Sequence, residues 1–148
     1  ITYMDLPNLL GAADIVSIHV PLVPETYHLI NKDNIKLMKP GSFLVNTARG
    51  GVVETEAILR ALEQGILAGV GLDVLEEESA LKEERELLTK EFLKTCDLKT
   101  QLLNHVLLTK DNVIITPHNA FNSREALEEI VRTTINNITS YLSEELNR

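Results

Sequence analysis

Four short apolar runs alternate along this chain of 148 residues with segments of helical periodicity. The runs cover residues 15–21, 42–48, 67–74 and 113–116. Such an alternation predicts a parallel sheet with helical crossovers. Because consecutive elements are usually neighbours, we expect the four strands in sequential order. Each predicted strand carries apolar residues on both of its faces. This pattern is typical of a sheet that is covered by helices on both sides. We therefore predict an α/β fold, a doubly wound parallel sheet of about four main strands.

The segments between the runs carry helix signals. Apolar residues recur at helical spacing over residues 55–63, and Gly65 supplies the expected left-handed stop. Asn31 predicts the N-cap of a short helix that ends at Met38. Residues 79–110 are charged and leucine-rich without glycine or proline, which favours a mostly helical, peripheral segment.

A capping-box pattern predicts the start of a long final helix. Asn122 is followed three residues later by Glu125. Beyond it, apolar residues mark one helical face: Leu127, Ile130, Val131, Ile135, Ile138 and Leu142.

Composition narrows the classes of function. The formal net charge of −8 argues against nucleic acid or an anionic membrane surface as a partner, because both require clustered Lys and Arg. No run approaches the roughly 18 apolar residues of a membrane span. The single Cys96 cannot form an internal disulfide and has no metal-type spacing around it, so we expect a reducing cytoplasm and no metal site.

Charged residues follow three of the apolar runs. Arg49 follows the second run, the acidic cluster 76–78 follows the third, and His118 follows the fourth. Open α/β sheets place their chemistry at the carboxyl ends of the strands. Each residue alone is more often a solvated surface group, but their shared position predicts a site.

The motifs around these residues, taken together and in this order, resemble a known family. They read SIHVPL at 17–22, NTARGG at 46–51, GLDV followed by acids at 71–74, and TPHNAF at 116–121. The sequence resembles the NAD-dependent D-isomer-specific 2-hydroxyacid dehydrogenases, the family of D-lactate dehydrogenase and phosphoglycerate dehydrogenase, from about residue 5 to about residue 141.

The resemblance implies the C-terminal half of a Rossmann-type NAD-binding domain. The glycine fingerprint G-x-G-x-x-G does not occur, since Gly69 and Gly71 are followed by valine at position 74. Residues 1–121 would then be a partial cofactor domain, and residues 122–148 a helix that returns to the substrate domain.

The same resemblance assigns catalytic roles. Arg49 would hold the substrate carboxylate with two parallel hydrogen bonds and polarise the developing carbonyl. His118 would transfer the proton. Glu78 matches the acid that orients the histidine, although Glu76 and Glu77 are neighbours that a one-residue slip of the motif would substitute.

The resemblance also implies cofactor contacts, with NAD as the cofactor. These residues are Val20, Pro21 and Thr26 beside the adenosine and pyrophosphate, Thr47 and Ala48 beside the nicotinamide riboside, and Asp73 at the carboxamide. Phe121 could wall the substrate site or pack in the core.

Three hypotheses follow. The chain is part of an oxidoreductase that transfers hydride between NAD(H) and a D-2-hydroxy or 2-oxo acid, and shows little turnover alone. Alternatively, it is a catalytically inactive fragment that folds and associates, or an NAD-sensing interaction protein similar to a co-repressor. An open strand edge at residues 15–20 and the apolar final helix predict a homo-oligomer.

Overall fold

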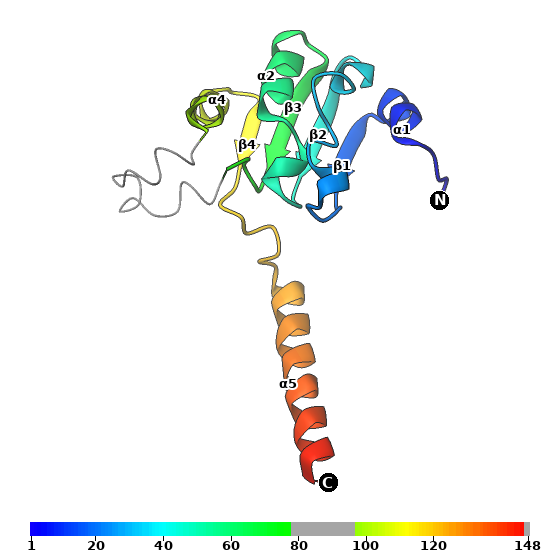
Figure 1. Ribbon diagram of the computed structural model, residues 1–148, viewed down its shortest axis with the longest axis vertical. Coiled ribbons are helices and arrows are strands. Elements are labelled where there is room, and N and C mark those ends of the chain that lie inside the picture. Colours follow the sequence, from blue (N-terminus) through cyan, green and yellow to red (C-terminus); the bar gives the residue numbers. More distant parts are fainter. Residues whose placement is uncertain (78–96, 147–148) are drawn as a thin grey trace. The chain divides into compact units, whose positions relative to one another are not determined.

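The computed structural model describes residues 1–77 and 97–146. The chain forms two compact units, Ile1–His118 and Asn119–Arg148. The first unit contains the sheet and the shorter helices, and the second contains the long helix α5 (Arg124–Leu146). Figure 1 shows these elements. Among the described residues, no helix is both long and apolar enough to cross a membrane.

The sheet has four strands: β1 (Ile15–Ile18), β2 (Ser42–Asn46), β3 (Leu67–Leu72) and β4 (Val113–Ile115). All neighbouring strands are parallel, and their order is β1-β2-β3-β4. The predicted α/β fold with a parallel sheet in sequential order is confirmed. Each strand ends before its apolar run does, because the last residues of the run leave the ladder and enter the loops at the carboxyl edge.

Helices lie before and between the strands. They are α1 (Leu6–Ala12), α2 (Thr55–Glu63) and α4 (Leu98–Leu108), with 3-10 turns η1 (Pro24–Thr26), η2 (Ile35–Leu37) and η3 (Gly50–Val52). The bounds of α2 are those predicted from its apolar spacing, and Gly65 ends it with a φ of +70°. Helix α1 was not predicted; it begins after Asp5, whose side chain accepts a hydrogen bond from Asn8 N at 3.0 Å.

One face of the sheet is buried. Val16, Leu44 and Val70 lie in register across three strands, and all are less than a tenth exposed. Leu10 of α1 and Leu107 of α4 belong to the same hydrophobic core. The helices therefore pack on this face and form one continuous core with it.

The opposite face is exposed in the part of the chain that the structure describes. It presents Ile15, Phe43 and Ile114, which are 64%, 47% and 71% exposed. Helical cover was expected on both faces and, within residues 1–77 and 97–118, is found on one. The reason is topological, because right-handed crossovers that always advance in the same direction place every connecting helix on the same side of the sheet.

Two helix starts differ from the sequence predictions. Asn31 does not begin a regular helix; its Oδ1 instead accepts a hydrogen bond from Asp33 N at 2.9 Å, and only η2 follows. Before α5, the hydroxyl of Ser123, not Asn122, accepts the hydrogen bond of Ala126 N at 3.2 Å. Local side-chain contacts of this kind compete with the helix for the same backbone donors.

The predicted helical segment 79–110 and the C-terminal residues also differ in part from their predictions. Of the predicted helical segment 79–110, residues 98–108 form α4, and residues 79–96 lie outside the described residues. Phe121 is 57% exposed in the second unit, so it does not pack in a core. The apolar face of α5 is also exposed, with values from 41% at Leu127 to 57% at Val131.

Candidate active site

A cavity of about 660 Å³ lies at the carboxyl ends of β1 and β2. Its lining consists of His19, Val20, Pro21, Leu22, Thr47, Ala48 and Arg49. Five of the residues predicted from the sequence therefore line one cavity, contributed by two neighbouring loops. Parallel strands bring their carboxyl ends to the same edge, which is where open α/β sheets bind ligands.

A buried amide shapes the turn that carries Arg49. Asn46 is 1% exposed at the end of β2. Its Nδ2 donates to the carbonyl oxygen of Arg49 at 2.9 Å, and its Oδ1 accepts from Ala48 N at 3.0 Å. This role of Asn46 was not predicted. The available signal was an amide side chain at the end of an otherwise apolar strand, since a buried amide must find partners.

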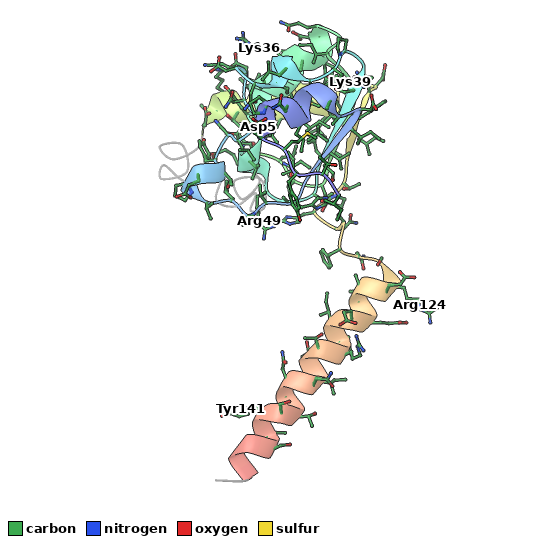
Figure 2. The ribbon with its side chains drawn as sticks, turned by 90° about the vertical axis from the view of Figure 1, so that its right-hand side faces the viewer. Asp5, Lys36, Lys39, Arg49, Arg124 and Tyr141 are labelled. Carbon is green, nitrogen blue, oxygen red and sulfur yellow. The ribbon has the colours of Figure 1, made fainter. Side chains whose placement is uncertain are left out.

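The guanidinium of Arg49 is exposed at this edge. In Figure 2, Arg49 lies at the end of the first unit opposite Lys36 and Lys39. Its Nη1 donates to the carbonyl oxygen of Ala48 at 2.6 Å. This bond uses one of the five N–H donors of the group, so the planar fork can still bind a carboxylate with two parallel hydrogen bonds.

The turn that follows β2, residues 47–51, is called the arginine turn. Gly50 brings it into direct contact with the loop that follows β3. A Cβ atom at this position would lie 2.0 Å from the carbonyl oxygen of Leu75 and 2.4 Å from the backbone nitrogen of Glu76. Only glycine allows two backbone segments to approach this closely. The two loops at the carboxyl edge are therefore packed backbone against backbone.

Asp73 and His118 are linked through Thr116. Asp73 is 4% exposed, and its carboxylate accepts a hydrogen bond from the Thr116 hydroxyl. His118 N donates to the carbonyl oxygen of Thr116 at 2.9 Å, and His118 has a φ of +52°. A histidine tolerates this left-handed region better than most residues. Asp73 N also donates to the Asn46 carbonyl oxygen at 2.9 Å, which ties this group to the arginine turn.

Thr26 is not part of the cavity lining, but it contacts the loop that carries Pro21. The Thr26 hydroxyl donates to the carbonyl oxygen of Pro21 at 2.6 Å and accepts from Val23 N at 2.9 Å. It therefore braces the loop that carries Pro21. Glu78, the predicted catalytic acid, lies outside the described residues.

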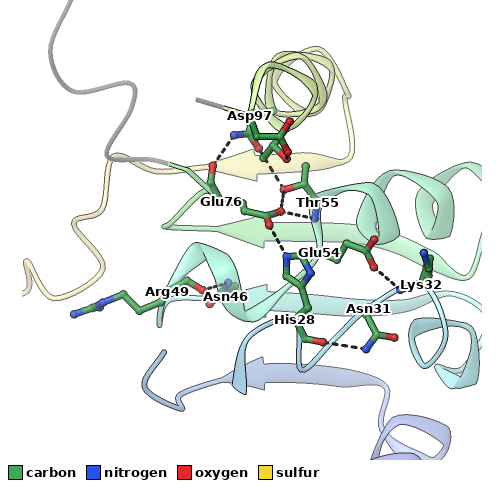
Figure 3. A network of polar contacts seen from close by, with 11 residues as sticks. His28, Asn31, Lys32, Asn46, Arg49, Glu54, Thr55, Glu76 and Asp97 are labelled. Carbon is green, nitrogen blue, oxygen red and sulfur yellow. Dashed lines mark hydrogen bonds and ion pairs between the residues drawn. The ribbon is translucent and has the colours of Figure 1, made fainter. Parts of the chain in front are cut away.

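Glu76 occupies a partly buried polar network beside the site (Figure 3). Its side chain is 10% exposed and forms a hydrogen-bonded pair with His28 Nε2. The carboxylate also accepts hydrogen bonds from Thr55 N at 3.0 Å and from the Thr55 hydroxyl at 2.8 Å. The ring of Tyr27 stacks on His28 with centroids 4.0 Å apart. Burial, and then the charge of Glu76, raise the pKa of Tyr27.

This sheet, with a ligand-sized cavity at its carboxyl edge and arginine, aspartate and histidine after successive strands, defines half of a Rossmann-type nucleotide-binding domain. Residues 1–120 match the family described as "D-isomer specific 2-hydroxyacid dehydrogenase, NAD binding domain". The chain belongs to this family, as the sequence motifs predicted.

Relatives and solved structures agree. The chain is 40% identical over 144 residues to a glyoxylate reductase of Thermofilum pendens, covering 97% of this chain and 36% of that protein. It is 36% identical over 140 residues to a D-lactate dehydrogenase of Escherichia coli, covering 95% and 40%. The structure of the Aquifex aeolicus D-lactate dehydrogenase complexed with NAD and lactic acid matches with a TM-score of 0.72 and 39% identity, covering 99% and 42%. The chain thus spans about two-fifths of these proteins.

NAD is the cofactor of this domain family. The cavity suits one part of it, because its volume lies within the range of small-molecule sites, about 300–1,000 Å³. Val20, Pro21 and Ala48 contribute small or apolar side chains to its lining, which would let a planar ring approach the backbone. The glycine turn that would anchor the pyrophosphate does not occur in these 148 residues.

Proposed function

We propose that this chain forms part of an oxidoreductase that transfers hydride between NAD(H) and a D-2-hydroxy or 2-oxo acid. Residues 1–121 would supply part of the NAD-binding domain, and residues 122–148 the helix that returns to the substrate domain. The observation that carries the proposal is the position of Arg49. It lies in the wall of the cavity, directly after Thr47 and Ala48, on a turn fixed by a buried amide.

The proposed chemistry divides between three side chains. Arg49 holds the carboxylate of the acid and polarises its carbonyl group. His118 takes the hydroxyl proton during oxidation and returns it during reduction. The role proposed for Glu78 is that of the acid that would accept a hydrogen bond from the second ring nitrogen, fix the tautomer and stabilise the protonated ring. NAD, when bound, accepts or supplies the hydride.

The proposed cofactor contacts follow the edge of the sheet. Val20 and Pro21 would lie beside the adenosine and pyrophosphate, with Thr26 holding their loop. Thr47 and Ala48 would approach the nicotinamide riboside. Asp73 would contact the carboxamide from the end of β3. Support comes from the shared cavity of Val20, Pro21, Thr47 and Ala48, and from the hydrogen bonds of Thr26 and Asp73.

A chimera provides the test. The 148 residues replace the matching segment of the Aquifex aeolicus D-lactate dehydrogenase, and NADH oxidation is followed with pyruvate, glyoxylate and hydroxypyruvate. We expect turnover in the chimera and little in the isolated chain, because the latter cannot hold hydride donor and acceptor together. His118→Ala should lower kcat about 10²- to 10⁴-fold, and Arg49→Ala should mainly weaken binding of the acid.

Arg60→Ala serves as the control, because Arg60 is an exposed arginine of α2 with a side chain 60% exposed. Equal losses in Arg49→Ala and Arg60→Ala would contradict the proposed role of Arg49. Turnover by the isolated chain that disappears in His118→Ala would show that the chain assembles a site without the glycine turn.

We also propose that the protein resides in a reducing cytoplasm and that the isolated chain forms homo-oligomers. The second proposal can be tested directly. β1 is an edge strand among the described residues, and Ile15, Phe43 and Ile114 expose apolar surface on one face of the sheet. An unpaired edge and an apolar face both favour association. Light scattering should give a mass of at least two chains, and Ile114→Asp should lower it. A monomer at high concentration would contradict this proposal.

A further inference from the structure

The carboxylate of Glu76 joins the loop after β3 to the start of α2. Thr55 is the first residue of α2, where backbone N–H groups have no partner within the helix. The preceding residue, Glu54, makes no capping hydrogen bond with its side chain. Glu76 accepts the hydrogen bond of Thr55 N instead, although it lies 21 residues further along the chain. The positive end of the helix dipole also favours a carboxylate at this position.

His28 connects Glu76 to the arginine turn. The ring of His28 pairs with the Glu76 carboxylate, and its backbone N–H donates to the carbonyl oxygen of Gly51 at 2.9 Å. His28 has a φ of +50°, a left-handed conformation that is uncommon outside glycine. This residue therefore binds the loop after β3 through its side chain and the turn after β2 through its backbone.

The arginine turn is thus held from two sides. Gly50 packs against the backbone of Leu75 and Glu76, and Gly51 accepts the hydrogen bond from His28. The pair of His28 and Glu76 joins these two contacts into a closed ring. Helix α4 also contacts this closed ring, because Asn104 Nδ2 donates a hydrogen bond to the carbonyl oxygen of Glu76 at 2.8 Å.

We propose that Glu76 and His28 are positioning residues that hold Arg49 at the cavity for its reaction with the acid. Neither needs to touch the substrate. Loss of the carboxylate leaves the Thr55 N–H and the His28 ring without their partner, and it releases the loop against which Gly50 packs. The kinetic consequence rests on the proposed function, whereas the structural consequence does not.

Amide hydrogen exchange on the 148-residue chain tests the structural consequence. In Glu76→Ala, the His28 amide, which donates to Gly51, and the Val52 amide, which donates to Arg49 at 3.2 Å, should exchange about tenfold faster or more. The Phe43 amide, which donates to Asp14 at 2.9 Å, should keep its rate. Glu76→Gln keeps an acceptor for Thr55 N and should restore part of the protection.

Glu56→Gln is the matched control, because Glu56 is another carboxylate in the first turn of α2 and pairs with Lys99 and Arg60 outside the ring. It should leave the exchange of His28 and Val52 unchanged. Unchanged exchange in Glu76→Ala, or equal acceleration at Phe43, would overturn the inference. The second result would mean that Glu76 only stabilises the whole fold.

Kinetics of the chimera test the consequence for the reaction. Glu76→Ala should lower kcat/KM for pyruvate about 10- to 100-fold, since a shift of about 1 Å in a positioning group costs up to about that much. KM for NADH should stay within about twofold, and Glu76→Gln should recover part of kcat. Equal rises in both KM values would overturn the assignment to Arg49. A chimera inactive with Glu76 in place would contradict the proposed function, while amide exchange would still decide the positioning role.

Discussion

Replacing Gly50 by alanine should be among the most damaging changes at the carboxyl edge. The added Cβ would lie 2.0 Å from the carbonyl oxygen of Leu75, 2.1 Å from its carbonyl carbon and 2.4 Å from the backbone nitrogen of Glu76. Protein Cβ atoms essentially never approach other heavy atoms to less than 3.0 Å. One of the two loops must therefore move by about 1 Å. All three atoms belong to the backbone, so no side-chain rotation can relieve the contact.

The expected cost follows from that displacement. Forcing extra volume into a packed site typically costs about 1–3 kcal/mol. We expect the upper end, about 3 kcal/mol, because the loop after β3 is held by Glu76 and cannot yield freely. For a unit of this size, that loss lowers the melting temperature by about 10 °C. The displaced arginine turn should also reduce kcat/KM of the chimera about 10²-fold.

Gly51→Ala is the matched control. Its Cβ would meet only the side chain of Leu22, at 3.3 Å, and that of Tyr27, at 3.5 Å, and both can shift by a few tenths of an ångström. We expect a loss below about 1 kcal/mol. Urea unfolding followed by circular dichroism compares the two variants. Equal midpoints would refute the argument that backbone approach, and not the general flexibility of the turn, requires glycine at position 50.

Two further changes test the energetics of the first unit. Hydrogen bonds from Lys99, and then from Arg60, hold the pKa of Glu56 at about 2, below its ordinary value of 4.5. The stability that these hydrogen bonds supply is present above about pH 4.5 and is lost as pH falls through about 2. In Glu56→Gln, the midpoint of urea unfolding should therefore depend less on pH between about 2 and about 4.5. A urea midpoint that falls in acid as steeply in Glu56→Gln as in the unchanged chain would contradict this. Ser42→Ala should leave the free energy of unfolding unchanged or raise it by up to about 1 kcal/mol, because the Ser42 hydroxyl is buried without a hydrogen-bond partner among the described residues. A loss of more than about 1 kcal/mol in thermal unfolding would show that this hydroxyl has a partner.

Local patterns predicted the elements whose signals lie within a few residues. The bounds of α2 followed from apolar spacing and the stop at Gly65, and the parallel order followed from the alternation of strands and helices. The two errors at helix starts arose where short-range polar contacts compete. Asn31 binds its own neighbours instead of starting a helix, and Ser123 takes the capping role expected of Asn122.

The site shows the same division. Motifs singled out Arg49, and the structure places it in one cavity with the predicted Val20 and Thr47. An amide at the end of a mostly apolar strand signals that Asn46 needs hydrogen-bond partners, but the partners it finds, in the backbone of Ala48 and Arg49, depend on the closed turn. The motif indicates Glu76 only as a substitute for Glu78 after a slip. Its contacts to His28, 48 residues away, and to Thr55, 21 residues away, leave no periodic signal in the sequence.

Short-range patterns along the chain specify the fold class, the family and the residue types at the strand ends, because strand periodicity, turn chemistry and motif spacing act over short stretches of chain. Tertiary structure alone decided which face of the sheet is covered, why glycine is required at position 50, and how His28 and Glu76 reach the arginine turn. These features depend on distances between segments far apart in the chain. Such distances are set by the packing of the β2 and β3 loops against each other, which no local pattern records.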